Sequence, residues 1–590
     1  MKKLLIVLLS LIGGMTLLMV GAIVLLGIAG MLMKPRVPST TILEVNLEAQ
    51  LIEAVPDDAF ASFMLRESPT VLGYVQALER AATDDRVAGL IAKVGAGGHG
   101  LAVTQDLRDA IRTFRESGKF AIAYSETFGE VGPGNGGYYL ATAFDEIWLQ
   151  PSGDVGLTGI LYEYPFIKGT LDKLGVMPQM DHRHEYKNAK NLFTETEFTE
   201  AHREAMRSLM DSQFGQLVRG IAEGRNLTEE VVRDLADRGP LLGSEAEEAG
   251  LVDGLAYRDE VYARAREQGG GSARFLYLDR YRERASRKRR ADHTIALIYG
   301  IGTVTRGASG YDAMSGEMTM GSDTVARAIR SAVDDNSVAA IVFRVNSPGG
   351  SFVASDAIWR ETLLARDAGK PVVITMGNVA ASGGYFVAMG ADGIVAQPGT
   401  ITGSIGVLAG KMVTRDMWPK IGLSWDEVHS SRNATMWSGL RPYTPDEWSR
   451  LQAWLDRVYD DFTGKVAEGR ALPLERVQEI AKGRVWTGEE ALEVGLIDAV
   501  GGFPAAIRLA KEAAGIDPDA SVRLKIFPAR KTPLQHFLEE TRESSDRRAA
   551  AEALRRSVRT LQPYVRQIRQ IALGPTAYGP LSIPPMEGND

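Results

Sequence analysis

Short apolar runs alternate with amphipathic stretches along most of the chain. In the second half, apolar runs at Thr294–Tyr299, Val338–Val345 and Pro371–Met376 alternate with helical spacing at 323–335 and 354–367. Short buried strands joined by helical crossovers are typical of a parallel sheet with helices on its faces. The pattern therefore predicts an α/β fold for this half of the chain.

The first half follows the same pattern. Strands are expected near 41–46, 87–93 and 119–124, and each half continues into a helical region, at about 196–237 and 444–482. In open α/β sheets, binding sites form at the carboxyl ends of the strands. We therefore expect functional residues in the turns that follow the strands.

The two halves also match residue by residue. Residues 382–398 and 135–151 are identical at 8 of 17 positions, and residues 468–498 correspond to 223–253. The offset between matching residues stays between 245 and 252, which is too long for a solenoid unit. We therefore predict two tandem homologous domains, each a parallel sheet with flanking helices.

One segment is apolar enough to cross a membrane. Residues 4–33 contain no charged side chain, and this stretch exceeds the ~20 residues that span a bilayer. The apolar run of a cleaved signal peptide is usually shorter, ~7–15 residues, so we expect an uncleaved transmembrane helix in contact with membrane lipid. Because the flanking positive charges nearly balance, they barely decide its orientation.

These features divide the chain into five parts. The expected order is a transmembrane anchor at 1–37, a first repeat at 38–278, a basic linker at 279–292, a second repeat at 293–517, and a helical extension with a loose tail at 518–590. The basic run Arg280–Arg290 carries seven Lys/Arg in eleven residues. This run suits a solvated linker, and a contact with anionic lipid head groups is the alternative.

Composition excludes several classes of function. The net charge of −8 argues against a general nucleic-acid-binding protein. The chain has no cysteine, which excludes disulfides, thiolate catalysis and zinc–thiolate sites. Its seven histidines include no H-x-x-x-H pair and give no strong metal signal. We expect neither a metal nor another cofactor.

A serine distinguishes the two repeats. Ser382 opens a Ser-Gly-Gly-Tyr run, whereas the first repeat has Asn135 before the same Gly-Gly-Tyr. Glycines permit a tight strand-to-helix turn, and a helix N-terminus offers N–H donors that suit the oxyanion of a tetrahedral intermediate. Ser382 is therefore the candidate nucleophile, with the backbone N–H groups of Gly383 and Gly350 as candidate oxyanion donors. The alternative is that these are only glycine-rich turns, and the Asn135 contrast counts against it.

A serine hydroxyl needs a neighbouring base. The histidines of the second repeat and its tail lie in no recognisable motif: His293, His429 and His536. A lysine in an apolar pocket can lose ~3–5 pK units and act as a base. Lys187 in the first repeat aligns with Arg432 in the second, and arginine cannot act as a base. Because the serine survives in one repeat and the lysine in the other, we expect one site assembled from both. Lys190 is a nearby rival.

A second hydroxyl lies downstream. Ser404, in Thr-Gly-Ser-Ile-Gly (402–406), follows Ser382 by 22 residues, and the first repeat has Leu157 at this place. A hydroxyl here would hydrogen-bond the lysine amine and orient its lone pair. A turn-capping role is the alternative.

Together these motifs resemble one family. They are Asn-Ser-Pro-Gly-Gly-Ser (346–351), Ala-Ala-Ser-Gly-Gly-Tyr (380–385), Thr-Gly-Ser-Ile-Gly (402–406) and Tyr-Lys-Asn-Ala (186–189). These motifs occur on tandem repeats that follow one amino-terminal membrane anchor. In this arrangement they look like the long form of signal peptide peptidase A. The resemblance covers about residues 40–515.

The resemblance implies a serine endopeptidase with a Ser-Lys dyad, in the fold shared by the caseinolytic protease and the crotonase enzymes. Carried over, Ser382 is the nucleophile, Lys187 the general base and Ser404 the lysine-orienting serine. Single-repeat relatives keep the lysine in the same repeat as the serine, where this chain has Arg432. The family implies remnant signal peptides as substrates and a homotetramer. It also implies that the protein is located in the bacterial inner membrane, with the catalytic part on the periplasmic side.

Two other functions fit part of the pattern. A crotonase-type acyl-CoA enzyme would use the same two-amide oxyanion hole for an enolate. Such enzymes generally use glutamate or aspartate and no serine nucleophile. A non-catalytic membrane scaffold would need the second repeat to be as inactive as the first, although the second repeat keeps every polar motif element.

Overall fold

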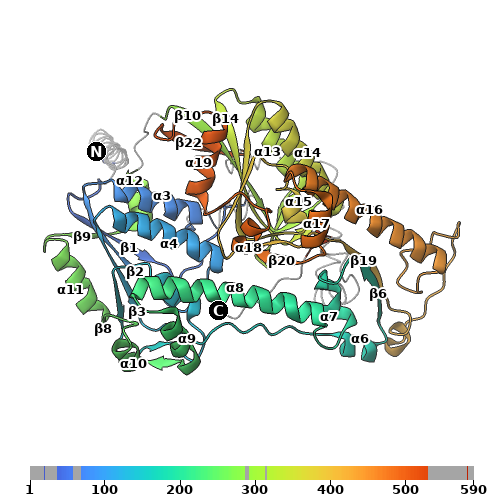
Figure 1. Ribbon diagram of the computed structural model, residues 1–590, viewed down its shortest axis with the longest axis horizontal. Coiled ribbons are helices and arrows are strands. Elements are labelled where there is room, and N and C mark those ends of the chain that lie inside the picture. The colour runs from blue at the N-terminus through green and yellow to red at the C-terminus, as the bar shows by residue number, and fades with distance from the viewer. Residues whose placement is uncertain are drawn as a thin grey trace, which may run out of the picture.

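The computed structural model describes residues 36–56, 68–285, 291–312 and 315–528, together with Met19, Leu65 and residues 581–582 (Figure 1). Apart from Met19, the predicted transmembrane helix at 4–33 lies outside these residues, as does most of the predicted helical extension at 518–590. In the part of the chain that is described, no helix has the length and apolar character needed to cross a membrane.

The first repeat is built on a six-stranded parallel sheet. Its order is β8–β4–β3–β2–β1–β9. The bounds are β1 Thr41–Asn46, β2 Val87–Lys93, β3 Phe120–Ser125, β4 Glu146–Leu149, β8 Gly254–Leu255 and β9 Arg274–Tyr277. The apolar runs predicted as strands are the central strands of this sheet, and their buried side chains form its core.

The second repeat has the same strand order, β21–β17–β16–β14–β10–β22, again parallel. The bounds are β10 His293–Ile301, β14 Val338–Ser347, β16 Val372–Ala381, β17 Gly393–Ala396, β21 Ala499–Val500 and β22 Val522–Phe527. Two more strands extend this sheet. β18 (Ile401–Gly403) pairs with the last residues of β16, and β20 (Val485–Thr487) runs antiparallel to β18. The prediction of α/β repeats with parallel sheets is confirmed.

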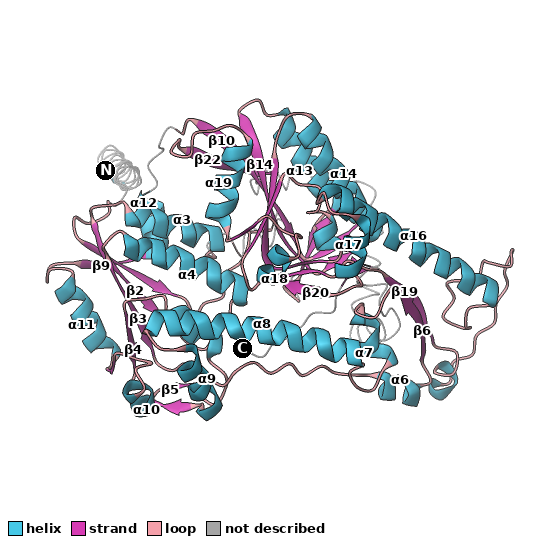
Figure 2. Ribbon diagram, in the orientation of Figure 1, coloured by secondary structure: helices cyan, strands magenta, loops and turns pink. Residues whose placement is uncertain are grey.

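Helices cover the sheets of both repeats (Figure 2). In the first they are α3 Val71–Ala82, α4 Leu101–Glu116, α5 Asn135–Ala141, α6 Lys168–Leu174, η1 Asn188–Lys190, α7 Asn191–Thr194, α8 Glu200–Arg225, α9 Glu229–Arg238, α10 Gly243–Glu248, α11 Arg258–Gln268 and α12 Leu278–Ala285. In the second they are α13 Ser322–Asp334, α14 Phe352–Asp367, α15 Gly383–Phe386, η2 Trp418–Ile421, α16 Pro445–Gly469, α17 Leu474–Ile480, α18 Gly488–Glu493 and α19 Phe503–Ala513.

The long helices α8 and α16 begin with the same kind of N-cap, a threonine side chain. The Thr199 side chain accepts a hydrogen bond from the His202 N–H, and the Thr444 side chain accepts one from the Glu447 N–H. Such caps satisfy donors that the first turn leaves unpaired. The first residue of α16 lies 245 residues after that of α8, which matches the repeat.

Short strands complete the described structure. They are β5 Asp154–Val155, β6 Met177–His182, β7 Leu241–Leu242, β11 Thr303–Thr305, β12 Gly310–Tyr311, β13 Met318–Gly321, β15 Gly349–Gly350, β19 Leu408–Val413 and β23 Leu581–Ser582. β12, β13, β11, β15 and β23 form a small sheet in that order. β6 of the first repeat pairs antiparallel with β19 of the second, so a segment of one repeat lies on the other.

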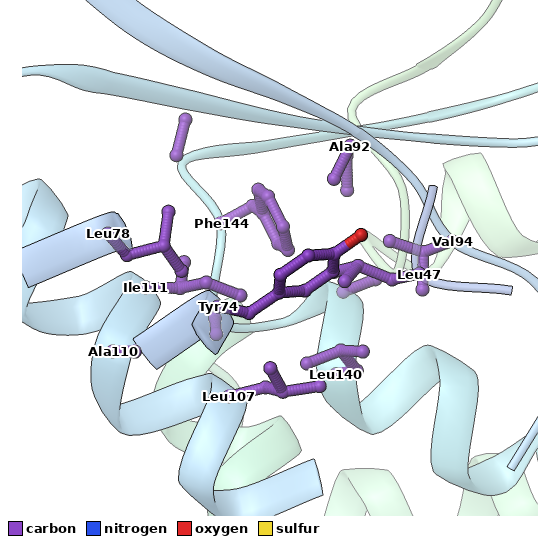
Figure 3. Packing of buried hydrophobic residues seen from close by; sticks show 14 of the residues in the cluster. Leu47, Tyr74, Leu78, Ala92, Val94, Leu107, Ala110, Ile111, Leu140 and Phe144 are labelled. Carbon is purple, nitrogen blue, oxygen red and sulfur yellow. The ribbon is translucent and has the colours of Figure 1, made fainter. Parts of the chain in front are cut away.

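One apolar core joins the repeats. Side chains of α3 and α4 pack beneath the first sheet, where Tyr74 lies among Leu107, Ile111 and Leu140 (Figure 3). The same cluster continues into the second repeat through residues of β14, β16 and α19. The two repeats are therefore packed together as one body.

A buried ionic cluster crosses the same boundary. Arg344 of β14 is fully buried and forms ion pairs with Glu53 at 2.9 Å and with Asp106 at 3.0 Å. Removing one partner of such a cluster leaves an uncompensated buried charge, which costs about 3–5 kcal/mol. These contacts fix the orientation of the second sheet against α4.

The structure also places the segments at the predicted domain boundaries. Part of the predicted basic linker is helix α12, whose Tyr281 is fully buried and hydrogen-bonds Asp84 of the first repeat. Residues 286–290 lie outside the described chain. β22 pairs with β10, so the sheet of the second repeat continues to Phe527, ten residues beyond the predicted boundary at 517.

Candidate active site

Ser382 lies at the carboxyl end of β16, where the strand turns into α15. Its backbone has φ 55° and ψ −117°, a combination that is rare for a residue with a side chain. The turn is held because the Ser382 N–H donates to the Gly403 carbonyl at 2.7 Å, and the Thr402 hydroxyl donates to the Ala380 carbonyl at 2.7 Å. The extra strand β18 therefore fixes the position of the candidate nucleophile, which is fully buried.

Two glycine turns meet beside this serine. Gly350 has φ 155°, and a Cβ at this position would lie 2.2 Å from the Val304 carbonyl oxygen. A Cβ on Gly383 would lie 3.0 Å from the Gly350 backbone nitrogen. Both positions therefore need glycine, and the backbone nitrogens of the two turns lie close to each other next to Ser382. This is the arrangement expected of two oxyanion donors.

Lys187 reaches Ser382 from the other repeat. β6 ends at His182, and the chain continues over the second repeat to Lys187, whose backbone packs on Gly483. The Lys187 Nζ lies 2.8 Å from the Ser382 Oγ. This distance falls within the ~2.6–3.2 Å range that connects a nucleophile to its base. The structure thus brings together the two residues that the repeats retain separately.

Burial changes the acidity of this lysine. Lys187 is fully buried, and desolvation lowers the pKa of its ammonium to about 7. A small cavity of about 50 Å³ beside it is lined by Tyr164, His202, Met206 and Val485. Burial also lowers the pKa of His202 to about 4, so this ring is neutral and adds no charge to the site. Near neutral pH the amine of Lys187 is therefore available as a proton acceptor.

Ser404 holds the same amine from a second side. Its Oγ lies 3.0 Å and its carbonyl oxygen 2.9 Å from the Lys187 Nζ. Ser404 is buried with φ 52°, and its own N–H donates to the Arg484 carbonyl at 2.7 Å. A neutral amine has two N–H donors and one lone pair. In the neutral amine, two donors directed at Ser404 would leave the lone pair for the Ser382 hydroxyl.

The other candidates lie elsewhere. Lys187 rather than Lys190 makes the contact with Ser382. His293 and His429 are both exposed, whereas Ser382 is buried, and His536 lies outside the described chain. Arg432, which aligns with Lys187, is 88% exposed at its side chain.

The side chain of Asn135 has a different role from that of Ser382, its counterpart in the second repeat. Its side-chain amide donates to the Gly159 carbonyl at 2.8 Å, and its side-chain oxygen accepts from the N–H groups of Thr158 and Gly159. The asparagine thus fastens the turn that corresponds to the Ser404 turn. In the first repeat this position stabilises the fold and carries no hydroxyl.

Sequence reasoning missed Gly483. This residue has φ 81°, and a Cβ on it would lie 2.5 Å from the Lys187 backbone nitrogen and 2.6 Å from its Cβ. The Tyr186 N–H also donates to the Lys482 carbonyl at 3.1 Å. A single glycine in Lys-Gly-Arg carries no signal by itself, because its role depends on a segment nearly 300 residues earlier in the chain.

The sequence is similar to those of known proteins in both repeats. The model of peptidase family S49 matches residues 114–270 and 364–517, one segment in each repeat. The chain is 31% identical over 467 residues to the chloroplastic serine protease SPPA of Arabidopsis thaliana, covering 78% of this chain and 68% of that protein. It is 32% identical over 467 residues to protease 4 of Haemophilus influenzae, covering 76% and 74%. It is 34% identical over 419 residues to protease 4 of Salmonella typhi, covering 69% and 65%.

Proposed function

The chain belongs to peptidase family S49 and is a serine protease, and on that premise we propose that Ser382 is its nucleophile and Lys187 its general base. The observation that carries this assignment is the 2.8 Å distance between the Lys187 Nζ and the Ser382 Oγ. In this proposal Ser404 orients the lysine, and the N–H groups of Gly383 and Gly350 form the oxyanion hole.

The reaction follows from these positions. Neutral Lys187 takes the hydroxyl proton of Ser382 as the Ser382 oxygen attacks the peptide carbonyl. The two backbone N–H groups stabilise the oxyanion that forms. The lysine ammonium then gives its proton to the leaving amine, which leaves an acyl-enzyme on Ser382. A water molecule, deprotonated by the same amine, attacks the acyl carbon. The ester bond to Ser382 then breaks as the proton passes back to the Ser382 oxygen, and the peptide acid is released.

The substrates proposed are extended apolar peptides, with remnant signal peptides as the natural class. Strand β15, which contains Gly350, pairs antiparallel with the two-residue strand β23 of the same chain. This edge thus accepts an antiparallel segment beside the proposed oxyanion hole. An extended substrate would use the same main-chain hydrogen bonds, since β-strand addition is a common mode of peptide recognition.

The cellular setting is part of the proposal. The uncharged segment 4–33 would anchor the chain in membrane lipid. We propose the bacterial inner membrane, with the catalytic repeats on the periplasmic side, and a homotetramer in the fold shared by the caseinolytic protease and the crotonase enzymes. These statements rest on the apolar segment and on the family resemblance of the motifs.

Replacement of the serine tests the assignment. Ser382→Ala should lower kcat/KM on an apolar fluorogenic peptide by about 10³-fold or more, because no nucleophile remains. The matched control is Ser125→Ala, which removes a fully buried hydroxyl of the first repeat that donates to the Thr127 carbonyl. Covalent labelling by a fluorophosphonate should also disappear in Ser382→Ala. Retained turnover with unchanged labelling would exclude Ser382 as the nucleophile.

A further inference from the structure

Helix α8 of the first repeat lies along the second repeat, where it contacts β20 and the beginning of α18 (Figure 1). Polar side chains on one face of α8, three or four residues apart, make these contacts. In order they are Glu204 to Arg484, Ser208 to Glu490, Ser212 to Thr487, Gln216 to the Pro398 carbonyl and Arg219 to Glu489. This set, here called the α8 row, joins the two repeats along one helix face.

The first contact of the α8 row lies beside the proposed base. One oxygen of the Glu204 carboxylate accepts the Tyr186 hydroxyl at 2.8 Å, and the other accepts the Arg484 guanidinium at 2.9 Å. Tyr186 directly precedes Lys187 in the chain. Arg484 directly follows Gly483, which packs against the Lys187 backbone. One carboxylate therefore holds both of the chain segments that meet at the lysine.

Arg484 has a second connection to the site. Its backbone carbonyl accepts the Ser404 N–H at 2.7 Å, and Ser404 in turn contacts the amine of the lysine. The Arg484 guanidinium lies over the rings of Tyr186 and Trp486, at 5.2 Å and 4.8 Å from the two centroids. A planar guanidinium can stack on aromatic rings and pair with a carboxylate at the same time. A displacement of Arg484 would therefore move the Ser404 turn as well as the lysine segment.

The far end of the α8 row has an ion pair without this connection. Arg219 pairs with Glu489, in the first turn of α18, at 2.6 Å. Within the described chain, neither of these side chains hydrogen-bonds Lys187 or Ser404. The helix residues at the two ends are similarly open to solvent, since the Glu204 side chain is 57% exposed and that of Arg219 is 47% exposed. Both ends thus join the repeats, but only one end adjoins the lysine segment.

We propose that Glu204, Arg484 and Tyr186 form a positioning cluster, which holds the amine of the proposed base against the hydroxyl of the proposed nucleophile. The inference rests on the roles proposed above for Lys187 and Ser382. A general base must lie within ~2.6–3.2 Å of the group that it deprotonates, and a small displacement lowers the rate steeply. Because the cluster acts through the lysine, its loss should lower kcat and leave KM unchanged.

The two ends of the α8 row provide a matched pair of variants. Glu204→Ala and Arg219→Ala each remove one exposed member of an ion pair between the repeats, and both place a good helix former on the same helix. We expect Glu204→Ala to lower kcat about tenfold with KM unchanged, and Arg219→Ala to leave both values within about twofold. Glu204→Gln should lose less, because its amide oxygen still accepts a hydrogen bond. Hydrogen exchange of residues 183–190 should also be faster in Glu204→Ala alone, which requires no catalysis.

Equal kcat values in Glu204→Ala and Arg219→Ala would overturn the proposal, since the α8 row would then only join the repeats. Tyr186→Phe is a second variant in case Glu204→Ala does not fold. It removes one hydroxyl and should lower kcat about threefold with KM unchanged, whereas an unchanged kcat would also count against the cluster. These results differ from a failure of the proposed function, in which Ser382→Ala itself would retain turnover.

Discussion

The two repeats share one fold and, in the proposed assignment, each contributes a different part of one active site. Both have the same order of six parallel strands, yet β16 continues for ten residues up to Ser382, whereas β3 ends at Ser125 and a glycine-rich turn leads to Asn135. The first repeat contributes the buried Lys187, and the second exposes Arg432 at the same place. In the proposed assignment, each repeat thus supplies the part that the other lacks, on the same scaffold.

The sharpest way to break this comparison is to exchange the two basic residues. Lys187→Arg gives the first repeat the residue of the second. It should lower kcat/KM by about 10²–10⁴-fold, because a guanidinium cannot accept the serine proton. The reciprocal Arg432→Lys is the matched control and should leave peptidase activity unchanged, since this side chain is exposed. Comparable activity losses in both variants would contradict the division of roles.

The contact between Gly483 and the Lys187 backbone offers a second test. In Gly483→Ala the new methyl group would meet the Lys187 backbone, so we expect kcat to fall by about 10²-fold as the amine moves from Ser382. Gly369→Ala is the matched control, because Gly369 has a similar φ of 76° and open space around its Cβ. Thermal unfolding of both variants separates backbone strain from displacement of the lysine. Equal kcat values in both variants would argue against a positioning role.

The pH dependence sharpens the comparison further. Lys187 must be neutral to act as the proposed base, and burial lowers its pKa to about 7. The value of kcat/KM should therefore fall about tenfold per pH unit below 7 and level off above it. A peptide substrate without titratable groups keeps this profile free of substrate ionisation. A profile that still rises steeply between pH 8 and 10 would indicate a lysine with an ordinary pKa.

The smallest expected effect comes from restoring a serine in the first repeat. Asn135→Ser should create no second active centre. The counterpart of Lys187 is Arg432, whose side chain is exposed and cannot act as a base. The substitution removes the side-chain bonds to Thr158 and Gly159, so we expect a loss of about 1–3 kcal/mol in the free energy of unfolding. Denaturant titration measures this loss. Fluorophosphonate labelling of Ser382→Ala combined with Asn135→Ser would reveal any new nucleophile.

Much of the site could be predicted because the chain contains its own comparison. Ser382 and Lys187 are candidates because they differ between the repeats, and the strands were predicted from apolar runs. The extension of β16 and the branch through β18 were not predicted, because short strands at a sheet edge depend on tertiary pairing. Gly483 was missed for the same reason. Its neighbour Lys187 reaches it only because residues 177–189 of the first repeat pack on the second repeat.

The span of 195 residues between Lys187 and Ser382 has a consequence during biosynthesis. The lysine leaves the ribosome first, without any hydroxyl to activate, and at about 5–20 residues per second the serine follows some 10–40 s later. If Ser382 and Lys187 act as proposed, a partly made chain has no complete catalytic pair until the second half has folded against the first. In the proposed assignment, the catalytic pair is therefore completed only by the packing of one repeat on the other.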